Sequence, residues 1–267
     1  RDRLRSRGLG DVYKRQEKTI SPRNETVLKQ LHGAGIRVVL CTGRPIKAIQ
    51  PLIKQLGLTE PDDYSITFNG GLVQQNATNE ILARTSLSKD DLAPLHAYAK
   101  ELGIPLDVID LTQVYSLVDL GKSPYEAFLK GLMPFSDINF EDLPADDRFG
   151  KAVSASAKAV DHRDQLPAEI NAKFHAVPSR RNLLEFLPQH TDKASGLKQL
   201  LAHFGEDYSN LMAFGDEEND LGMLEAAEVG VAMDNAIPAV KAIATDHTLN
   251  NDADGVAVFL EQYFGLV

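Results

Sequence analysis

The densest group of chemically active side chains in the sequence is the run Gly215-Asp216-Glu217-Glu218-Asn219-Asp220. It follows an apolar segment, residues 211–214, and precedes a segment with helical spacing. Its four carboxylates repel one another unless a cation lies among them, and hard oxygen ligands on a tight glycine turn suit Mg2+. The run is equally typical of a capped helix start, because the helix dipole favours Asp and Glu there. Taken alone, it leaves both interpretations open.

Two further groups are suited to holding a phosphate. Thr42-Gly43-Arg44 offers a hydroxyl, a backbone N–H without an obstructing side chain and a guanidinium, at the start of an expected helix. Lys193 begins another expected helix, where its ammonium group could neutralise a phosphoryl oxygen. By itself, the Thr42-Gly43-Arg44 group is a weak signal. A lone surface lysine is the plainer interpretation of Lys193.

These groups stand where predicted strands end or helices begin. Residues 36–41 are a continuous apolar, β-branched run, which is typical of a strand covered on both faces in a parallel sheet. Ser21-Pro22 predicts the start of the preceding helix, and residues 66–68 predict a short strand before Asn69. The same alternation returns after residue 190, with a helix, a strand at 211–214, a helix at 221–227 and a strand at 229–233. Both ends of the chain are therefore predicted to build one α/β layer of βαβ units.

The middle of the chain, residues 72–189, has a different pattern. Ser88 opens a predicted helix that closes at Gly103, and four short strands are expected at 114–118, 151–157, 173–177 and 182–187. This pattern predicts an inserted α+β domain, which would lie over the ligand-binding edge of the sheet. Arg180 and Arg181 are candidates for contacting a substrate phosphate or sugar from this insert.

Composition limits the classes of function. The 267 residues are 43% hydrophobic and 25% charged, which is typical of a soluble globular protein. The net charge of −10 argues against a nucleic-acid surface, and we find neither a membrane-spanning run nor a secretory signal, so we expect a cytoplasmic protein. Cys41 is expected to be a core thiol. The seven histidines lack zinc-site spacing and are expected to be surface or packing residues.

The first 16 residues differ in composition from the rest of the chain. They hold six basic and two acidic residues, with arginine at positions 1, 3, 5 and 7, a pattern of neither a core strand nor a packed helix. We interpret residues 1–16 as a non-native leader from cloning or sequence assembly. A basic arm for an anionic partner is the alternative.

In their order along the chain, five segments resemble the Cof-type sugar phosphatases of the haloacid dehalogenase (HAD) superfamily. They are Thr42-Gly43-Arg44, Phe68-Asn69-Gly70, Lys193-Ala194-Ser195-Gly196, residues 215–220, and Val229-Gly230-Val231-Ala232-Met233-Asp234-Asn235-Ala236. The resemblance covers about residues 17–267. It implies an α/β fold in which a Rossmann-like parallel-sheet core, residues 17–71 plus 190–267, carries an inserted α+β cap of the C2 type, residues 72–189.

The same resemblance implies Mg2+-dependent hydrolysis of small phosphomonoesters, sugar phosphates first, through an aspartyl-phosphate intermediate. It implies catalytic roles for Lys193 and Thr42, and Mg2+ binding by Asp216 and Asp220, with Asp220 alternatively orienting the loop or the waters of the metal. The residues that the resemblance assigns to substrate or phosphate binding are Thr42, Gly43, Arg44, Asn69, Lys193 and Asn219, of which Asn69 and Arg44 are expected to face the cleft under the cap. The expected partner is a small phosphorylated metabolite, with neither nucleic acid nor membrane, and the expected state is a monomer or homodimer. Pyridoxal phosphate, a phosphorylated flavin precursor and polyol phosphates remain open as substrates.

The sequence departs from that family at one place. Members open with an apolar strand followed by Asp-x-Asp-Gly-Thr, whose first Asp attacks phosphorus and whose second protonates the leaving alcohol. Counting back from Thr19-Ile20-Ser21-Pro22 puts Gly8 and Gly10 at these positions, and glycine can do neither. We expect a nearly inactive and poorly stable chain, because a missing central strand would leave two neighbouring strands unpaired beside a void.

Three hypotheses follow. The chain is a phosphatase whose true start was replaced by a foreign leader, or a non-catalytic module that binds phosphate or sugar phosphate, or an unrelated α/β structural or interaction protein. The break in composition at Glu17 beside intact downstream motifs favours the first. Binding of Mg2+ and phosphate at Asp216 and Lys193 separates the first two from the third.

Overall fold

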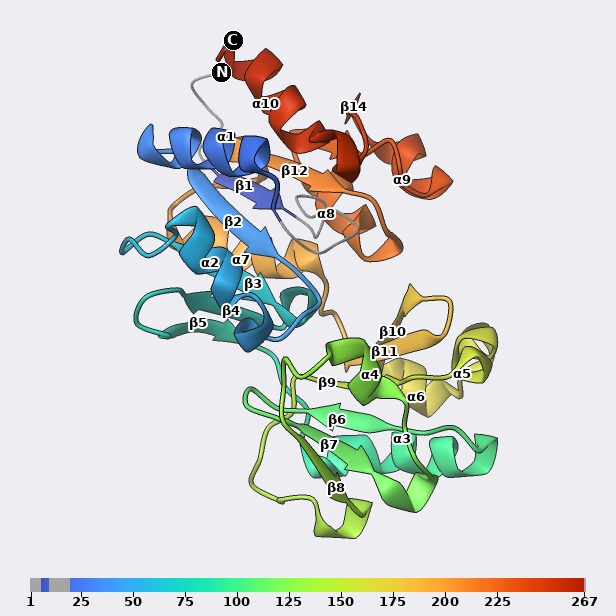
Figure 1. The fold of residues 1–267 in the computed structure, drawn as a ribbon. Helices are drawn as coiled ribbons and strands as arrows, with labels where there is room; N and C mark the ends of the chain where they lie inside the picture. The colour runs from blue at the N-terminus through green and yellow to red at the C-terminus, as the bar shows by residue number, and fades with distance from the viewer. Residues whose placement is uncertain (1–5, 10–19, 267) are drawn as a thin grey trace. The chain divides into compact units, whose positions relative to one another are not determined.

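The computed structural model describes residues 6–9, for which only the backbone is described, and residues 20–266. The chain forms two compact units, which are labelled by element in Figure 1. The core unit comprises residues 1–44, 49–84 and 192–267, and the inserted unit comprises residues 45–48 and 85–191.

The core unit is built on an eight-stranded sheet with the order β14-β13-β12-β1-β2-β3-β4-β5. Neighbouring strands from β14 to β3 are parallel, and β4 and β5 continue the sheet in antiparallel pairing. The strands are β1 (Ser6–Leu9), β2 (Arg37–Cys41), β3 (Tyr64–Thr67), β4 (Leu72–Gln75), β5 (Ile81–Arg84), β12 (Leu211–Gly215), β13 (Val229–Ala232) and β14 (Asp246–His247). The polar segments singled out above follow the carboxyl ends of β2, β3 and β12.

The central position of this sheet is occupied, which the sequence analysis did not expect. Ser6–Leu9 pairs in parallel with β2 on one side and β12 on the other, with Gly8 opposite Val39 and Ala213. The expectation that two neighbouring strands would be left unpaired is therefore wrong. Four residues of backbone suffice for the pairing, because a parallel ladder uses main-chain groups whatever the side chains are. The rest of the segment interpreted as a leader, residues 1–5 and 10–16, lies outside the described residues.

Helices cover both faces of the core sheet, as the ribbon in Figure 1 shows. On one face, α7 (Lys193–His203) and α8 (Leu221–Ala226) pack apolar side chains against Val39, Cys41 and Ile66. On the other, α1 (Pro22–Gly33) and α10 (Gly255–Phe264) are joined by a buried hydrogen bond from the Ala257 N–H to Asn24 Oδ1. The remaining helices of this unit are α2 (Gln50–Leu56) and α9 (Pro238–Ile243).

The boundary of the insert differs from the prediction. Residues 72–84, which were assigned to the insert, form β4 and β5 and extend the core sheet beyond β3. The inserted unit therefore begins at residue 85 rather than at residue 72. The segment Leu72-Val73-Gln74-Gln75 shows no alternation of apolar and polar residues, so the sequence does not indicate a strand there. All four residues are nevertheless buried.

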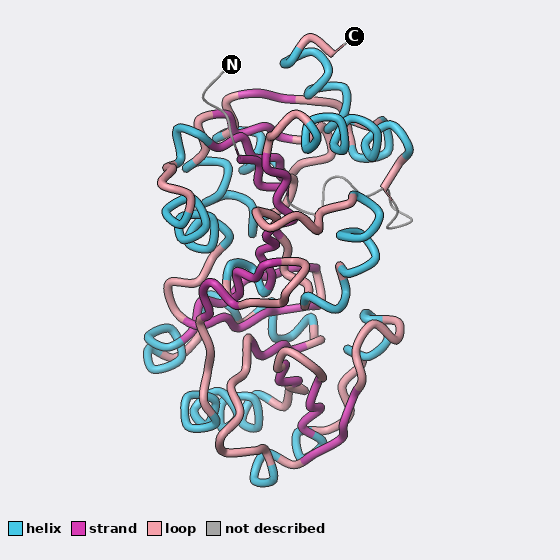
Figure 2. The backbone as a smooth tube through the Cα atoms, turned by 90° about the vertical axis from the view of Figure 1, so that its left-hand side faces the viewer, coloured by secondary structure: helices cyan, strands magenta, loops and turns pink. Residues whose placement is uncertain are grey.

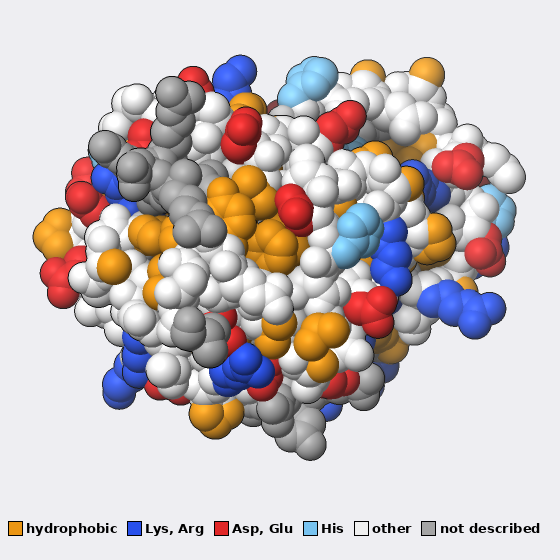
Figure 3. Space-filling view, turned by 90° about the horizontal axis from the view of Figure 1, so that it is seen from above, with side chains coloured by type: hydrophobic (Ala, Val, Ile, Leu, Met, Phe, Trp, Pro, Cys, Tyr) orange, Lys and Arg blue, Asp and Glu red, His pale blue; other side chains and the backbone are white. Residues whose placement is uncertain are grey.

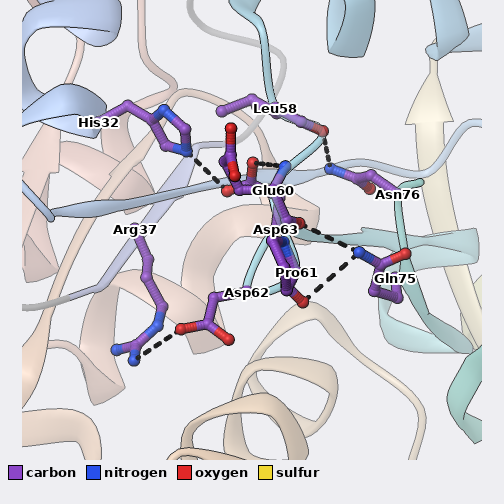
Figure 4. A network of polar contacts seen from close by, with 9 residues as sticks. All are labelled: His32, Arg37, Leu58, Glu60, Pro61, Asp62, Asp63, Gln75 and Asn76. Carbon is purple, nitrogen blue, oxygen red and sulfur yellow. Dashed lines mark hydrogen bonds and ion pairs between the residues drawn. The ribbon is translucent and has the colours of Figure 1, made fainter. Parts of the chain in front are cut away.

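A polar network fixes the loop that leads into β3 (Figure 4). The Asp63 carboxylate lies 2.8 Å from His32 Nε2 and accepts the Glu60 N–H through its other oxygen. Gln75 and Asn76, at the end of β4, donate side-chain N–H groups to backbone carbonyls of the same loop. These hydrogen bonds fix the loop before β3, and the Phe68–Gly70 turn follows β3 at its other end.

The inserted unit is an α+β layer with a six-stranded sheet of order β10-β11-β9-β6-β7-β8. Helices α3, α5 and α6 supply Leu92, Leu95, Ala159 and Ile170 to a single apolar core on one face of that sheet. The tube in Figure 2 distinguishes the strands and helices of both units by colour. The elements are α3 (Lys89–Leu102), β6 (Asp107–Ile109), β7 (Val114–Leu117), α4 (Tyr125–Leu129), β8 (Phe135–Ile138), β9 (Lys151–Ser154), α5 (Ala157–Asp161), α6 (Ala168–Lys173), β10 (Phe174–Arg180) and β11 (Leu183–Pro188).

Local capping signals in the sequence are confirmed at both helix starts that were named. Ser21 Oγ accepts the Asn24 N–H, and Ser88 forms a capping box with Asp91. One expectation needs correction: the strand expected at 151–157 ends at Ser154 because α5 begins at Ala157. None of the described helices combines the length and apolar character that crossing a membrane requires.

Candidate phosphate and metal site

Thr42 begins the loop after β2 and is completely buried. Its N–H donates to the Ile66 carbonyl over 2.9 Å, and its Oγ1 accepts the Arg44 N–H over 3.2 Å. The loop is thus tied to β3 and turned on itself, with Gly43 and Arg44 half-buried beside it. The segment predicted to hold phosphate is thus a compact turn at the carboxyl end of β2.

The turn Phe68–Gly70 follows β3 and carries unusual backbone angles. Phe68 and Asn69 both have φ of 52°, and Gly70 has φ of 101°. Left-handed conformations cost on the order of 1–3 kcal/mol for residues other than glycine and persist only where the surroundings enforce them. Here the Asn69 N–H donates to the Thr42 carbonyl and the Phe68 N–H donates to the Arg44 carbonyl. The strained turn is fastened to the Thr42–Arg44 loop.

Lys193, the first residue of α7, forms an ion pair with Asp220. Its Nζ lies 2.6 Å from Asp220 Oδ1, and both side chains are 2% exposed. Burying two charges is costly unless they pair closely and their remaining hydrogen-bonding positions are used. Asp192 caps the helix by accepting the Ser195 N–H, which fixes the helix start and thereby the base of the lysine side chain.

Asp220 uses both of its carboxylate oxygens within the chain. Oδ1 accepts from Lys193, and Oδ2 accepts the N–H groups of Asp216 and Glu217 over 3.0 and 3.2 Å. These contacts wrap the acidic loop around one buried carboxylate. They favour the second role considered for Asp220, orientation of the loop, over direct binding of a metal.

Asp216 is a half-buried carboxylate of the acidic loop. Its Oδ2 accepts from Asn235 Nδ2 over 2.8 Å. Burial, helped by the neighbouring Asp220 and Glu217 carboxylates, raises the pKa of Asp216 to about 7 against the opposing effects of Asn235 and Lys193. Burial also raises the pKa of Glu217. The loop therefore concentrates negative charge that a cation would stabilise.

The carboxylates of the acidic loop fit an Mg2+ ion that takes only one or two of its ligands from the protein. Among the described residues, no group of three or more His, Cys, Asp or Glu side chains is placed to hold a metal ion. Mg2+ is commonly held by one or two carboxylates, with water and substrate phosphate completing its shell. Asp216 offers one such carboxylate in the acidic loop, so the residues present are compatible with Mg2+.

Asn219 and Asn69 are brought together across 150 positions of sequence. Asn219 Nδ2 donates to Asn69 Oδ1 over 3.0 Å, and Asn69 is 2% exposed. Thr42, Gly43, Asn69, Lys193 and Asn219 thus belong to one set of contacting loops in the core unit. Arg180 and Arg181, in contrast, are exposed residues of the inserted unit, and the Arg180 guanidinium lies 5.5 Å from the centre of the Phe128 ring.

Sequence analysis missed the function of one residue in a motif that it had quoted. Asn235 donates to Asp216 and accepts the Asn251 N–H over 3.1 Å, so it links the acidic loop to the segment before α10. Its position directly after β13, next to a strand that pairs with β12, was the available signal. Cys41, with no exposed surface, is a core thiol as predicted.

Comparisons with known proteins agree with this geometry. The model of the haloacid dehalogenase-like hydrolase family matches residues 14–260. A Bacillus subtilis protein named "Putative phosphatase YxeH" is 34% identical over 240 residues, which cover 87% of this chain and 88% of that protein. The 5-amino-6-(5-phospho-D-ribitylamino)uracil phosphatase YitU of the same species is 30% identical over 285 residues, 97% of this chain and 96% of its own. A solved sugar phosphatase of HAD subclass IIB superposes with a TM-score of 0.83 at 21% identity, covering 99% of this chain and 100% of its own.

Proposed function

Since this chain belongs to the haloacid dehalogenase-like hydrolases and similar proteins are named phosphatases, we propose that its core unit binds small phosphomonoesters together with Mg2+. Sugar and polyol phosphates are the proposed substrate class. The names of two similar proteins support this class, one a sugar phosphatase and the other acting on a phosphorylated ribityl compound. The observation that carries the proposal is the buried Lys193–Asp220 pair at the loop edge of the sheet.

Each side chain then has a definite task. The backbone N–H of Gly43 and the hydroxyl of Thr42 hold phosphate oxygens, and Lys193 neutralises their charge while Asp220 fixes the ammonium group. Asp216 would hold Mg2+, which when bound supplies positive charge to the phosphate oxygens. Asn219 donates an N–H to the phosphate.

We further propose that turnover by this chain is nearly absent. Phosphoryl transfer through a covalent intermediate needs a nucleophile in line with the leaving oxygen, and the central strand Ser6–Leu9 carries no Asp or Glu. Electrostatic stabilisation alone cannot replace an attacking group, and β1 supplies none. The proposed activity of the chain is therefore binding without efficient hydrolysis.

The test is calorimetric titration with inorganic phosphate, with and without MgCl2, beside an assay of phosphate release from a panel of sugar and polyol phosphates. We expect binding that Mg2+ strengthens, and release close to background. Lys193→Met should abolish binding, whereas Lys198→Met, an exposed lysine of the same helix, should leave it unchanged. Circular dichroism of both variants checks that the fold is retained.

Each contrary result has a definite meaning. Wild-type protein that binds neither phosphate nor Mg2+ would contradict the proposed function and favour a structural role. Vigorous Mg2+-dependent release would contradict the proposed inactivity, and would direct attention to Asp11, the first carboxylate after β1 in the sequence.

A further inference from the structure

We propose that Asn69 is a positioning residue: its side-chain oxygen orients the Asn219 amide so that one N–H of Asn219 is presented to the bound phosphate. This inference rests on the proposed function. It differs from the expectation drawn from the family resemblance, in which Asn69 faces the substrate cleft under the cap. The turn that carries Asn69 thereby acts through a second residue.

The first support is the bond between the two amides. Asn219 Nδ2 carries two hydrogens, and one of them is committed to Asn69 Oδ1 at 3.0 Å. A primary amide is planar, so holding one N–H fixes the direction of the other. Asn69 is 2% exposed, and its position is set by its own main-chain bond to Thr42. The acceptor is therefore more firmly held than the half-buried Asn219 that it orients.

The second support is that the chain makes room for the Asn69 side chain. A Cβ atom at Gly43 would lie 2.8 Å from Asn69 Oδ1 and 3.0 Å from Asn69 Nδ2. Only glycine at position 43 allows the amide to lie directly against the phosphate loop. The amide thus lies between Gly43 on one side and Asn219 on the other.

The third support is that the same turn also touches the helix that carries Lys193. A Cβ atom at Gly70 would lie 1.8 Å from the Asp192 carbonyl oxygen, and one at Gly196 would lie 2.9 Å from Gly70 Cα. The strained Phe68–Gly70 turn therefore contacts the phosphate loop, the start of α7 and Asn219 of the acidic loop. A turn in contact with all three can fix their relative positions, which explains why its backbone strain is maintained.

The test compares Asn69→Gly with Asn79→Gly. Both replace a left-handed asparagine of the core unit, with φ of 52° and 63°, by the residue that tolerates this conformation best, so the backbone change is matched. Asn79 is exposed and lies outside the site. We expect Asn69→Gly to weaken binding of inorganic phosphate by roughly 3–10-fold, the usual range for one hydrogen bond, and Asn79→Gly to leave it unchanged.

A double-variant cycle separates positioning from a general loosening of the fold. If Asn69 acts through Asn219, then Asn69→Gly combined with Asn219→Ala should bind phosphate no more weakly than Asn219→Ala alone. Independent, multiplying losses from the two substitutions would overturn the inference, as would unchanged binding by Asn69→Gly.

A second measurement does not depend on affinity. In the nitrogen–proton NMR spectrum of the free wild-type protein, one side-chain proton of Asn219 should be protected from exchange, and Asn69→Gly should remove that protection. On addition of phosphate, the other proton should shift. If phosphate shifts the amides of Gly43 and Lys193 but not the side chain of Asn219, the inference fails while the proposed function stands. If phosphate shifts none of them, the proposed function fails as well.

Discussion

At the scale of single residues, the buried carboxylate of Asp107 shows how burial of an acidic group makes stability depend on pH. This carboxylate of β6 has no exposed surface and accepts hydrogen bonds from the hydroxyls of Ser116 and Ser123. Burial raises its pKa from 3.8 to about 6, although the two hydroxyls oppose the shift. The folded state therefore holds a proton more tightly than the unfolded chain does. Stability contributed by this proton is complete below pH 3.8 and is lost as the pH rises through about 6.

Replacing Asp107 by Asn should accordingly stabilise the protein at neutral and alkaline pH. We expect the free energy of unfolding in urea to rise by on the order of 2–3 kcal/mol near pH 8, and the difference from wild type to shrink towards zero near pH 4. Asp161→Asn, at an exposed carboxylate at the end of α5, is the control, with an expected change of about 0.5 kcal/mol or less. A difference for Asp107→Asn that does not depend on pH would contradict the assignment to this proton.

At the scale of elements, the contact between the Phe68–Gly70 turn and α7 requires a residue without a side chain. Gly70 and Gly57 both have positive φ, 101° and 69°, but only Gly70 has a close neighbour, since nothing lies within 4 Å of a Cβ built at Gly57. Gly57→Ala should cost only the left-handed backbone penalty, about 1–2 kcal/mol. Gly70→Ala should cost more than about 3 kcal/mol, because α7 must also move away. Equal losses in urea unfolding would show that the close approach to Asp192 is relaxed without cost.

The elements of the core could be predicted from the sequence where local signals were strong. Continuous apolar runs marked β2 and β12, and Ser21 and Ser88 marked helix starts, because capping is decided by neighbouring residues. β1 was missed because its residues lack any strand pattern, and its pairing depends on the neighbours β2 and β12. β4 and β5 were assigned to the insert because the regular alternation of helices and strands stops after residue 71, and this change was taken as a domain boundary.

The residues of the site were predictable, but the contacts among them were not. Each loop after a strand carried a recognisable polar motif, so Thr42, Lys193, Asp216 and Asn219 could be named. The bond between Asn219 and Asn69 joins residues 150 positions apart and depends on the strand order of the sheet. The same holds for Asp220, whose two oxygens bind Lys193 and the loop backbone.

At the scale of the whole molecule, the charge of the chain is negative. The chain carries a net charge of −10, and on the face shown in Figure 3 acidic and basic side chains lie interspersed. A surface of this kind does not supply the continuous positive field that a phosphate backbone requires. Binding of a small phosphate must then depend on local groups such as Lys193, which is consistent with the buried position of that lysine.

The chain is also divided into two units, each with its own apolar core. The buried cluster of the inserted unit lies wholly between Leu87 and Phe186 and includes Phe149, which has no exposed surface. Among the described residues, its six strands form a sheet of their own, and an isolated antiparallel bridge pairs Leu87 with Phe149. Domains of this size bury enough surface to fold alone.

We therefore expect a fragment of residues 85–191 to fold cooperatively when expressed by itself. Residues 45–48 complete the unit in the whole chain, but the hydrogen bond from Lys47 to the Thr112 carbonyl is exposed and contributes little. Phe149→Ala should lower the free energy of unfolding by about 3–5 kcal/mol in the fragment, because it opens a cavity in a closed core. The same substitution should cost an equal amount in the unfolding phase of that unit in the full chain. An unstructured fragment, or losses that differ by more than about 1 kcal/mol between the two contexts, would mean that the core unit is needed to hold the insert together.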